Sequence, residues 1–201
     1  MVNRCFNGSS RSTYGLTVLA PIKPDAGTLS PKGEISRYLA TCPTGPESPL
    51  AKVSTTHQAR WVVIAGLPYE GYPAHVDFLK SSYLLFTSNF DGDLDVYLEA
   101  LATRIPETIS ALWTHCVGFP GVESLEPFKT YMKACQIETT FYFGAYPDAT
   151  VEQVLRALAV QRRFVEFVLA TQGKPARELQ QAFQTLIAHC RQMPTPNPGS
   201  V

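Results

Sequence analysis

The segment Tyr83-Leu84-Leu85-Phe86-Thr87-Ser88-Asn89-Phe90 leads into Asp91-Gly92-Asp93 near the middle of a chain of 201 residues. Its aliphatic and aromatic side chains favour a β-strand. Asp91 or Asp93 can then cap a helix, because apolar residues recur at helical spacing from Leu94 to Ile105. The segment therefore predicts a strand that passes directly into a helix.

Three other segments have a similar composition and predict strands at residues 14–22, 57–64 and 138–146. Helices are expected at residues 31–41, from Pro106 onward, and at residues 125–134, since Pro is tolerated at the first helical position. Thr150-Val151-Glu152-Gln153 is a capping box that opens a long helix. Gly173-Lys174-Pro175 ends that helix, and a final helix follows.

This order of elements indicates an α+β fold of the ferredoxin-like, split βαβ type, with an antiparallel sheet, inserted helices and two C-terminal helices. We expect a flexible leader at residues 1–13, a single domain at 14–191 with a helical extension at 150–191, and a disordered tail at 192–201. The third and fourth strands carry large apolar groups on both faces. The C-terminal helix pair or a second copy of the sheet must therefore cover the second face.

Composition excludes several classes of protein. The chain has 17 basic and 17 acidic residues, and this zero net charge argues against a nucleic-acid partner. No apolar run is long enough to span a membrane, and the N-terminus lacks the apolar stretch of a secretion signal. The five cysteines are scattered and never spaced CxxC, which favours reduced thiols and a cytoplasmic location.

In its order of strands, the region 14–146 resembles the dimeric α+β-barrel superfamily, and residues 56–64 and 84–93 look like the signature of an uncharacterised branch. That superfamily includes cofactor-free monooxygenases and cyclases, chlorite dismutases and dye-decolourising peroxidases. The resemblance implies a homodimer with an apolar pocket on the sheet for a hydrophobic small molecule. It implies an enzyme or binding protein without a cofactor, of the oxygenase, cyclase or isomerase type.

Two alternatives remain open. The first is a haem-dependent oxidative enzyme of the peroxidase-like branch, with His115 or His189 as the axial ligand. The second is a protein-interaction module without enzymatic activity, which would dock a partner on its aromatic face. A Soret band would favour the first alternative, and a dimer without a small-molecule ligand would favour the second.

His57, Arg60 and Asp91 are the candidate catalytic residues. If the second and third strands pair as a hairpin, His57 lies toward the end that carries Asn89 and Asp91. A carboxylate beside a histidine fixes its tautomer, which suits a general base. The alternative is that His57 opens a strand at a solvated edge. His57 is expected to share a strand face with Trp61, and Arg60 to lie on the opposite face.

Arg60 lies between apolar residues of a predicted strand. We expect it to be buried and paired with Asp91, Asp93 or Glu138, or to clamp an anionic group of the substrate. No metal site is expected at Asp91–Asp95, because the run lacks the order of a calcium loop and helix capping explains its acids.

Aromatic residues at strand spacing belong to the core more often than to a pocket. Tyr142 is the strongest pocket candidate, because it is expected to project from a strand on the same side as Thr140 and Gly144. The following residues are the candidate substrate-binding groups: Trp61, Tyr83, Asn89 and Tyr142.

Overall fold

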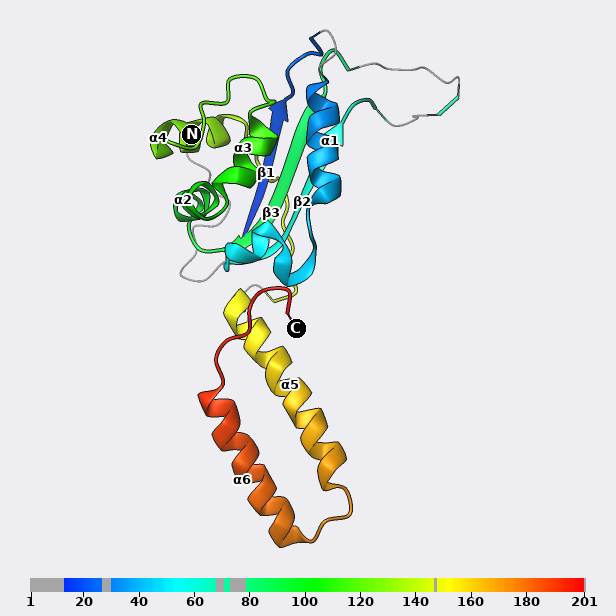
Figure 1. The fold of residues 1–201 in the computed structure, drawn as a ribbon, viewed down its shortest axis with the longest axis vertical. Helices are drawn as coiled ribbons and strands as arrows, with labels where there is room; N and C mark the ends of the chain where they lie inside the picture. The colour runs from blue at the N-terminus through cyan, green and yellow to red at the C-terminus, as the bar shows by residue number, and fades with distance from the viewer. Residues whose placement is uncertain (1–12, 27–29, 68–70, 73–78, 147, 201) are drawn as a thin grey trace.

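The computed structural model describes residues 13–26, 30–67, 71–72, 79–146 and 148–200 (Figure 1). The chain is of mixed α and β structure, as the sequence predicts. The elements follow in the order β1 (Thr13–Pro21), α1 (Pro31–Thr41), two short 3-10 helices (Gly45–Glu47 and Pro49–Lys52), β2 (Thr56–Ile64), β3 (Tyr83–Asp91), α2 (Leu94–Arg104), α3 (Pro106–Trp113), α4 (Leu125–Ala134), α5 (Val151–Thr171) and α6 (Ala176–Gln192).

The three strands form one antiparallel sheet in the order β1-β3-β2. β3 is the central strand, so the segment Tyr83–Phe90 forms the middle of the sheet. Every second residue of β3 is buried, from Leu84 through Phe86 and Ser88 to Phe90. This alternation matches the two-residue period of a strand with one face in the core.

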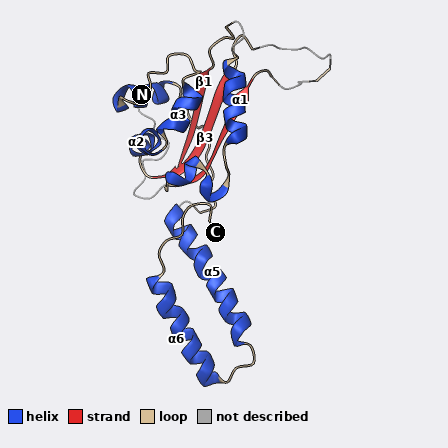
Figure 2. Cartoon of the chain, viewed as in Figure 1, coloured by secondary structure: helices blue, strands red, loops and turns tan. Residues whose placement is uncertain are grey.

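Helices α1, α2, α3 and α4 supply the other layer of the core (Figure 2). Phe86 of β3 meets the ring of Trp113 edge-on, with centroids 5.5 Å apart. Tyr97 of α2 stacks on Phe90 and bonds Ser88 through its hydroxyl group, 2.6 Å from Ser88 Oγ. The core therefore lies on one face of the sheet, between the strands and these helices.

The prediction of a strand at residues 138–146 is wrong, because this segment is coil. The chain runs beside β1 just before it: the Leu19 amide donates to the Cys135 carbonyl at 2.9 Å, and the Ile137 amide donates to the Thr17 carbonyl at 2.8 Å. Beyond this point the backbone leaves the ladder, and Phe141 and Phe143 are 83% and 76% exposed. Alternating aromatic residues do not make a strand without a neighbour along their whole length.

Two predicted helix starts, Asp93 before α2 and Thr150 before α5, are confirmed. Asp93 caps α2, since its Oδ1 accepts hydrogen bonds from the amides of Asp95 and Val96. Thr150 and Gln153 form the predicted capping box at the start of α5. Both features satisfy amide groups that a helix leaves without internal partners.

Helices α5 and α6 form an antiparallel hairpin that extends away from the sheet (Figure 1). They pack chiefly against each other. Of the two coverings that we considered for the second face of the sheet, the helix pair is therefore not the one observed. Residues 193–200, expected as a disordered tail, return toward the body as coil, and Thr195 Oγ1 donates to Glu152 Oε1 at 3.0 Å. Residues 1–12 of the expected leader lie outside the described part of the chain.

Four cysteines lie in the described part of the chain, and all four are free thiols. Cys116 is fully buried, whereas Cys42, Cys135 and Cys190 are half-buried. Cys5 lies outside the described residues.

Candidate functional site

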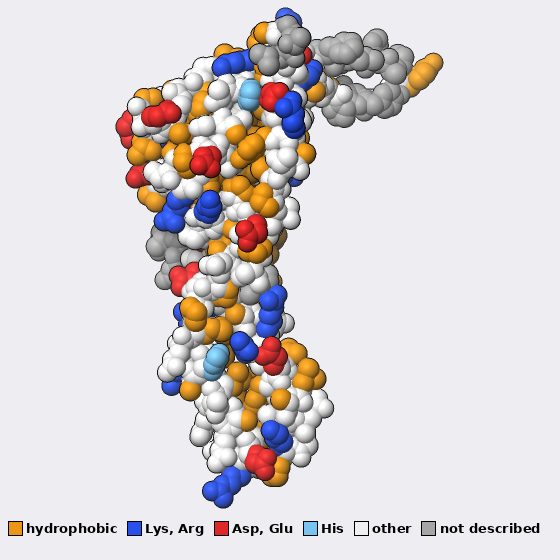
Figure 3. All heavy atoms as spheres, viewed as in Figure 1, with side chains coloured by type: hydrophobic (Ala, Val, Ile, Leu, Met, Phe, Trp, Pro, Cys, Tyr) orange, Lys and Arg blue, Asp and Glu red, His pale blue; other side chains and the backbone are white. Residues whose placement is uncertain are grey.

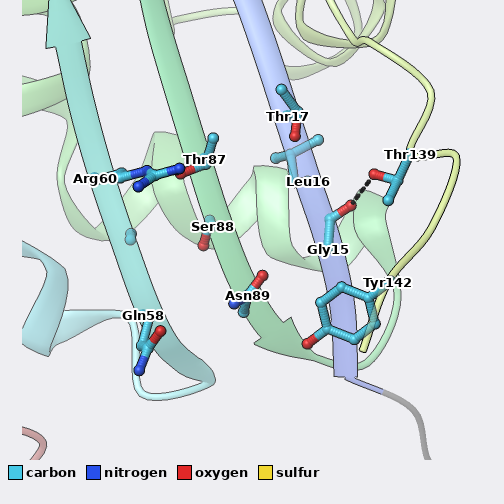
Figure 4. A pocket seen from close by; sticks show the side chains of 11 residues that line it. Gly15, Leu16, Thr17, Gln58, Arg60, Thr87, Ser88, Asn89, Thr139 and Tyr142 are labelled. Atoms are coloured by element: carbon cyan, nitrogen blue, oxygen red, sulfur yellow. Dashed lines mark hydrogen bonds between the residues drawn. The ribbon is translucent and has the colours of Figure 1, made fainter. Parts of the chain in front are cut away.

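A groove of about 630 Å³ opens on the sheet face that the helices leave uncovered (Figure 4). Its floor comes from all three strands, and its wall comes from the coil that follows β1's outer edge. The lining residues are Gly15, Leu16, Thr17, Gln58, Ala59, Arg60, Thr87, Ser88, Asn89, Thr139 and Tyr142.

The strand register arranges the polar part of the floor in two rows. Thr17, Thr87 and Arg60 lie opposite one another across β1, β3 and β2. One step along the same face, Asn89 lies between Gly15 and Gln58. Cross-strand neighbours on one face lie within reach of each other, so these side chains act as one polar surface.

Beyond these polar rows, the same sheet face is apolar. Leu85 lies opposite Leu19 and Val62, and Tyr83 lies opposite Pro21 and Ile64. The uncovered face therefore has a polar half, which forms the groove, and an apolar half beside it.

Arg60 is exposed, so the prediction that it is buried is wrong. It lies on the uncovered face, where a charge is not removed from water. Its Nε donates to Thr87 Oγ1 at 3.0 Å, which orients the guanidinium across the strands (Figure 4). Within the described residues no ion pair involves Arg60, and its two terminal nitrogens remain available to a ligand.

Tyr142 forms one side of the groove by packing its ring on Gly15. A Cβ atom at Gly15 would lie 2.8 Å from Cδ2 of that ring, so any larger residue would displace Tyr142. Thr139 Oγ1 donates to the Gly15 carbonyl at 3.3 Å and holds the coil at this point. Burial raises the pKa of the Tyr142 phenol, and the nearby charge of Asp91 raises it further. The phenol is therefore a neutral hydrogen-bond donor at neutral pH.

His57 and Asp91 lie together but are not among the residues that line the groove; His57 precedes the lining residue Gln58, and Asp91 is two residues beyond the lining residue Asn89. His57 Nε2 is 2.7 Å from Asp91 Oδ1, and the two side chains are 22% and 19% exposed. Asp91 Oδ2 also accepts the Val151 amide at 2.7 Å, so the carboxylate holds the start of α5. A carboxylate at Nε2 keeps the proton on that nitrogen and leaves Nδ1 to accept another.

His57 does not share a face with Trp61, contrary to our prediction. A β-bulge shifts the register between Thr56 and Gln58, which interrupts the two-residue alternation at His57. Trp61 stacks on Phe86 at a centroid distance of 5.2 Å, on the core side of the sheet. Trp61 therefore does not line the groove.

Of the other predicted ligand-binding residues, Asn89 and Tyr142 line the groove and Tyr83 does not. Tyr83 lies on the same face at the opposite end of β3. Gly15, Thr17, Gln58 and Thr87 were missed by the sequence reasoning. They can be recognised only by their position, because each lies opposite another groove residue in the register of the three strands.

His115 and His189, the two candidate haem ligands, lie in separate parts of the structure. His115 follows α3, and its backbone carbonyl accepts the Lys23 amide at 2.8 Å. His189 is exposed in the last turn of α6. Among the described residues, no group of three or more acidic, histidine or cysteine side chains is arranged to hold a metal ion.

Comparisons with known proteins do not identify the chain. No protein-family model matches it, and the comparisons with curated proteins and with solved structures found no significant match. None of the helices in the described residues is both long and apolar enough to cross a membrane. The functional assignment therefore rests on the groove and its neighbours.

Proposed function

We propose that the groove binds a small organic acid with an apolar body. The observation that carries this proposal is the guanidinium of Arg60, which lies in a polar groove without an acidic partner among the described residues. The fork of N–H groups on an arginine matches a carboxylate in geometry and charge. Gln58, Thr87 and Asn89 supply further hydrogen-bonding groups around it.

The size and the division of the sheet face support this class of ligand. Small-molecule sites occupy roughly 300–1,000 Å³, and the groove has about 630 Å³. A ligand with its carboxylate at Arg60 can extend over Leu85 and Val62, which lie on the same face. The ring of Tyr142 offers an apolar wall for a planar group on the other side.

We further propose a cofactor-independent reaction of the isomerase or cyclase type, begun by proton transfer. His57 Nδ1 takes a proton from a carbon next to the ligand's carbonyl group, and Asp91 stabilises the resulting imidazolium through Nε2. The electrons of the broken C–H bond move onto the carbonyl oxygen. Arg60 and the neutral phenol of Tyr142 stabilise that negative charge.

The strand order also supports the ferredoxin-like arrangement and the relationship to the dimeric α+β barrels. In a ferredoxin-like sheet the fourth strand lies antiparallel to the first at its outer edge. The Gln136 bridge to Val18 occupies that position here and is antiparallel. In the superfamily that the sequence resembles, the pocket lies where a sheet faces a second sheet or a helical layer.

Binding can be tested by NMR titration of the full chain with aromatic and aliphatic carboxylates and with their uncharged amides. We expect shifts in the amide signals of Gln58, Arg60 and Asn89 with the acids and weaker binding of the amides. Arg60→Met should lower acid affinity at least about tenfold. Arg37→Met is the matched control, because Arg37 pairs with Glu34 on the outside of α1. Equal binding of acids and amides would refute the proposal.

Proton transfer can be tested separately on any acid that binds. In D₂O, we expect the wild-type protein to exchange a hydrogen beside the ligand's carbonyl group. His57→Gln should slow this exchange about 100-fold or more without preventing binding, since glutamine can still bond Asp91. If an acid binds but its hydrogen does not exchange, the chain is a binding protein and the catalytic role of His57 is refuted.

A further inference from the structure

The α5–α6 hairpin has an apolar outer surface that nothing in the described chain covers. Apolar side chains that are 36–68% exposed follow both helices. One group lies on α5 and α6 together and defines what we call the hairpin face: Val160, Phe164, Val168, Leu179, Phe183 and Ile187. Figure 3 shows hydrophobic side chains reaching the surface along the hairpin, between scattered charged groups.

The residues of the hairpin face follow helical spacing and are joined by aromatic contacts. Residues four apart in sequence lie on one side of a helix. The three members on α5 are spaced in this way, and so are the three members on α6. Phe167 joins the two rows, because its ring lies 6.0 Å from that of Phe164 and 5.9 Å from that of Phe183. Beside these rings is an open groove of about 350 Å³, lined by Phe167, Ala176, Leu179, Gln180 and Phe183.

The α6 side of the hairpin face is poor in charge. Residues 179–188 contain no charged side chain, so most of α6 carries glutamine, threonine and apolar groups around its whole circumference. Helix α5 differs from α6, because it carries charged residues that include the ion pair of Arg163 with Glu166. Loss of charge and enrichment in aromatic residues distinguish the centre of a protein interface from ordinary surface.

A second stripe on α5 enlarges the uncovered area. Val154, Leu158, Val165 and Leu169 lie on one side of α5 and are also exposed. With these four and the six residues of the hairpin face, the exposed apolar area is on the order of 800 Å², taking large side chains as roughly 150–250 Å² each. This is close to the ~800 Å² that each partner buries in a stable interface.

We propose that the hairpin pairs with the hairpin of a second copy of this chain, forming a four-helix bundle between the two bodies. One hairpin offers both projecting phenyl rings and an apolar groove, so a two-fold axis brings rings and groove of each copy together. The area matches a complete dimer interface and needs no other surface. Each α5 then contacts α6 of its own chain on one side and the second copy on the others.

The test compares the oligomeric state of the full chain with that of variants, by sedimentation at about 1–100 µM. The wild-type protein should be a dimer at the upper concentration. Phe164→Glu with Phe183→Glu should raise the dissociation constant at least about 100-fold, because these rings lie at the centre of the contact. Val96→Glu is the matched control, since Val96 is 67% exposed on α2 of the body and should leave the dimer unchanged.

A second measurement, made on the wild-type protein, tests the proposal even if the double variant loses its helical structure. Hydrogen exchange of the wild-type protein at the two concentrations should show amides of α5 and α6 becoming more protected in the dimer, with β3 unchanged. A monomer at the upper concentration overturns the proposal. A folded double variant that still dimerises, or protection that appears on the sheet face, also overturns it. A monomer whose hairpin binds another protein would assign the surface to that partner.

Discussion

The sheet body and the helical hairpin contain similar apolar residues but use them differently. In the body, side chains from β1, β3 and four helices form one buried cluster around Phe86 and Trp113, and partly buried side chains of β2 pack against it. In the hairpin, no residue of α6 is fully buried. A helix completes its hydrogen bonds within itself, whereas a strand needs a neighbour. Apolar residues can therefore hold a regular helix beyond the core, while residues 138–146 remain coil.

The largest expected difference between the two regions is in the cost of truncating a side chain. Trp113→Ala should lower the free energy of unfolding by about 3–5 kcal/mol, because the ring is fully buried against Phe86 and Trp61. Leu169→Ala should cost less than about 0.5 kcal/mol at concentrations where the chain is monomeric, since Leu169 is exposed. Urea unfolding followed by circular dichroism measures both, and equal losses would contradict the distinction.

A polar contact inside the body should have the next largest effect. The Tyr97 hydroxyl lies 2.6 Å from Ser88 Oγ and 3.3 Å from Thr56 Oγ1, beneath the sheet. Tyr97→Phe should cost about 1–3 kcal/mol because it leaves the buried Ser88 hydroxyl without its partner. Adding Ser88→Ala should recover part of this loss. In a double-mutant cycle from urea unfolding, purely additive costs would show that the contact contributes nothing.

The body should also lose stability in alkaline solution in a way that the hairpin does not. Burial raises the pKa of the Cys116 thiol to about 12, and nearby Cys135 adds to the rise. A raised pKa means that the folded state favours the protonated thiol. Its stabilising contribution is complete below the ordinary value near 9 and is lost as the pH rises toward 12.

Between pH 8 and pH 10, this thiol should account for a loss on the order of 1 kcal/mol. Cys116→Ala should reduce the alkaline loss by that amount, measured as the change in urea midpoint between the two pH values. Leu169→Ala on α5 is the control, since it removes no titratable group and should leave the pH dependence as it is in the wild-type protein. An identical pH dependence in Cys116→Ala would contradict the prediction.

The smallest expected effect is confined to the hairpin. Thr150→Ala removes the side chain that accepts the Gln153 amide, and should cost about 0.5–1 kcal/mol at the start of α5. Hydrogen exchange should become faster at the first turn of α5 and remain unchanged in β3. Faster exchange throughout the sheet would show that the hairpin and the body unfold as one unit.

The elements that the sequence predicted well are those specified by nearby residues. Three strands, the Asp93 cap and the Thr150 capping box depend on composition or on partners three residues away. The predicted strand at 138–146 failed because a strand also needs a neighbour alongside it, which composition does not show. After Thr139 the chain leaves the edge of β1, and the ring of Tyr142 packs on Gly15 instead of extending a ladder.

The candidate site was predicted only in part, because the sequence shows the residue types but not the strand register that groups them. Arg60, Asn89 and Tyr142 could be chosen by residue type, but their grouping depends on the register of three strands. Trp61 was predicted to bind a ligand, but its ring packs on Phe86 on the core side of the sheet. Gly15 has no side chain to attract attention, and its importance appears only from its contact with Tyr142.

The β-bulge at His57 changes which residues of β2 face the core and which face the groove. Thr56 and Gln58 are two apart and should face the same way, yet Thr56 bonds Tyr97 beneath the sheet and Gln58 lines the groove above it. The bulge therefore inserts His57 between them while Thr56 keeps its place opposite Phe90 and Gln58 keeps its place opposite Asn89. Deleting His57 would restore the regular alternation with both of these placements intact, and would remove only the imidazole beside Asp91.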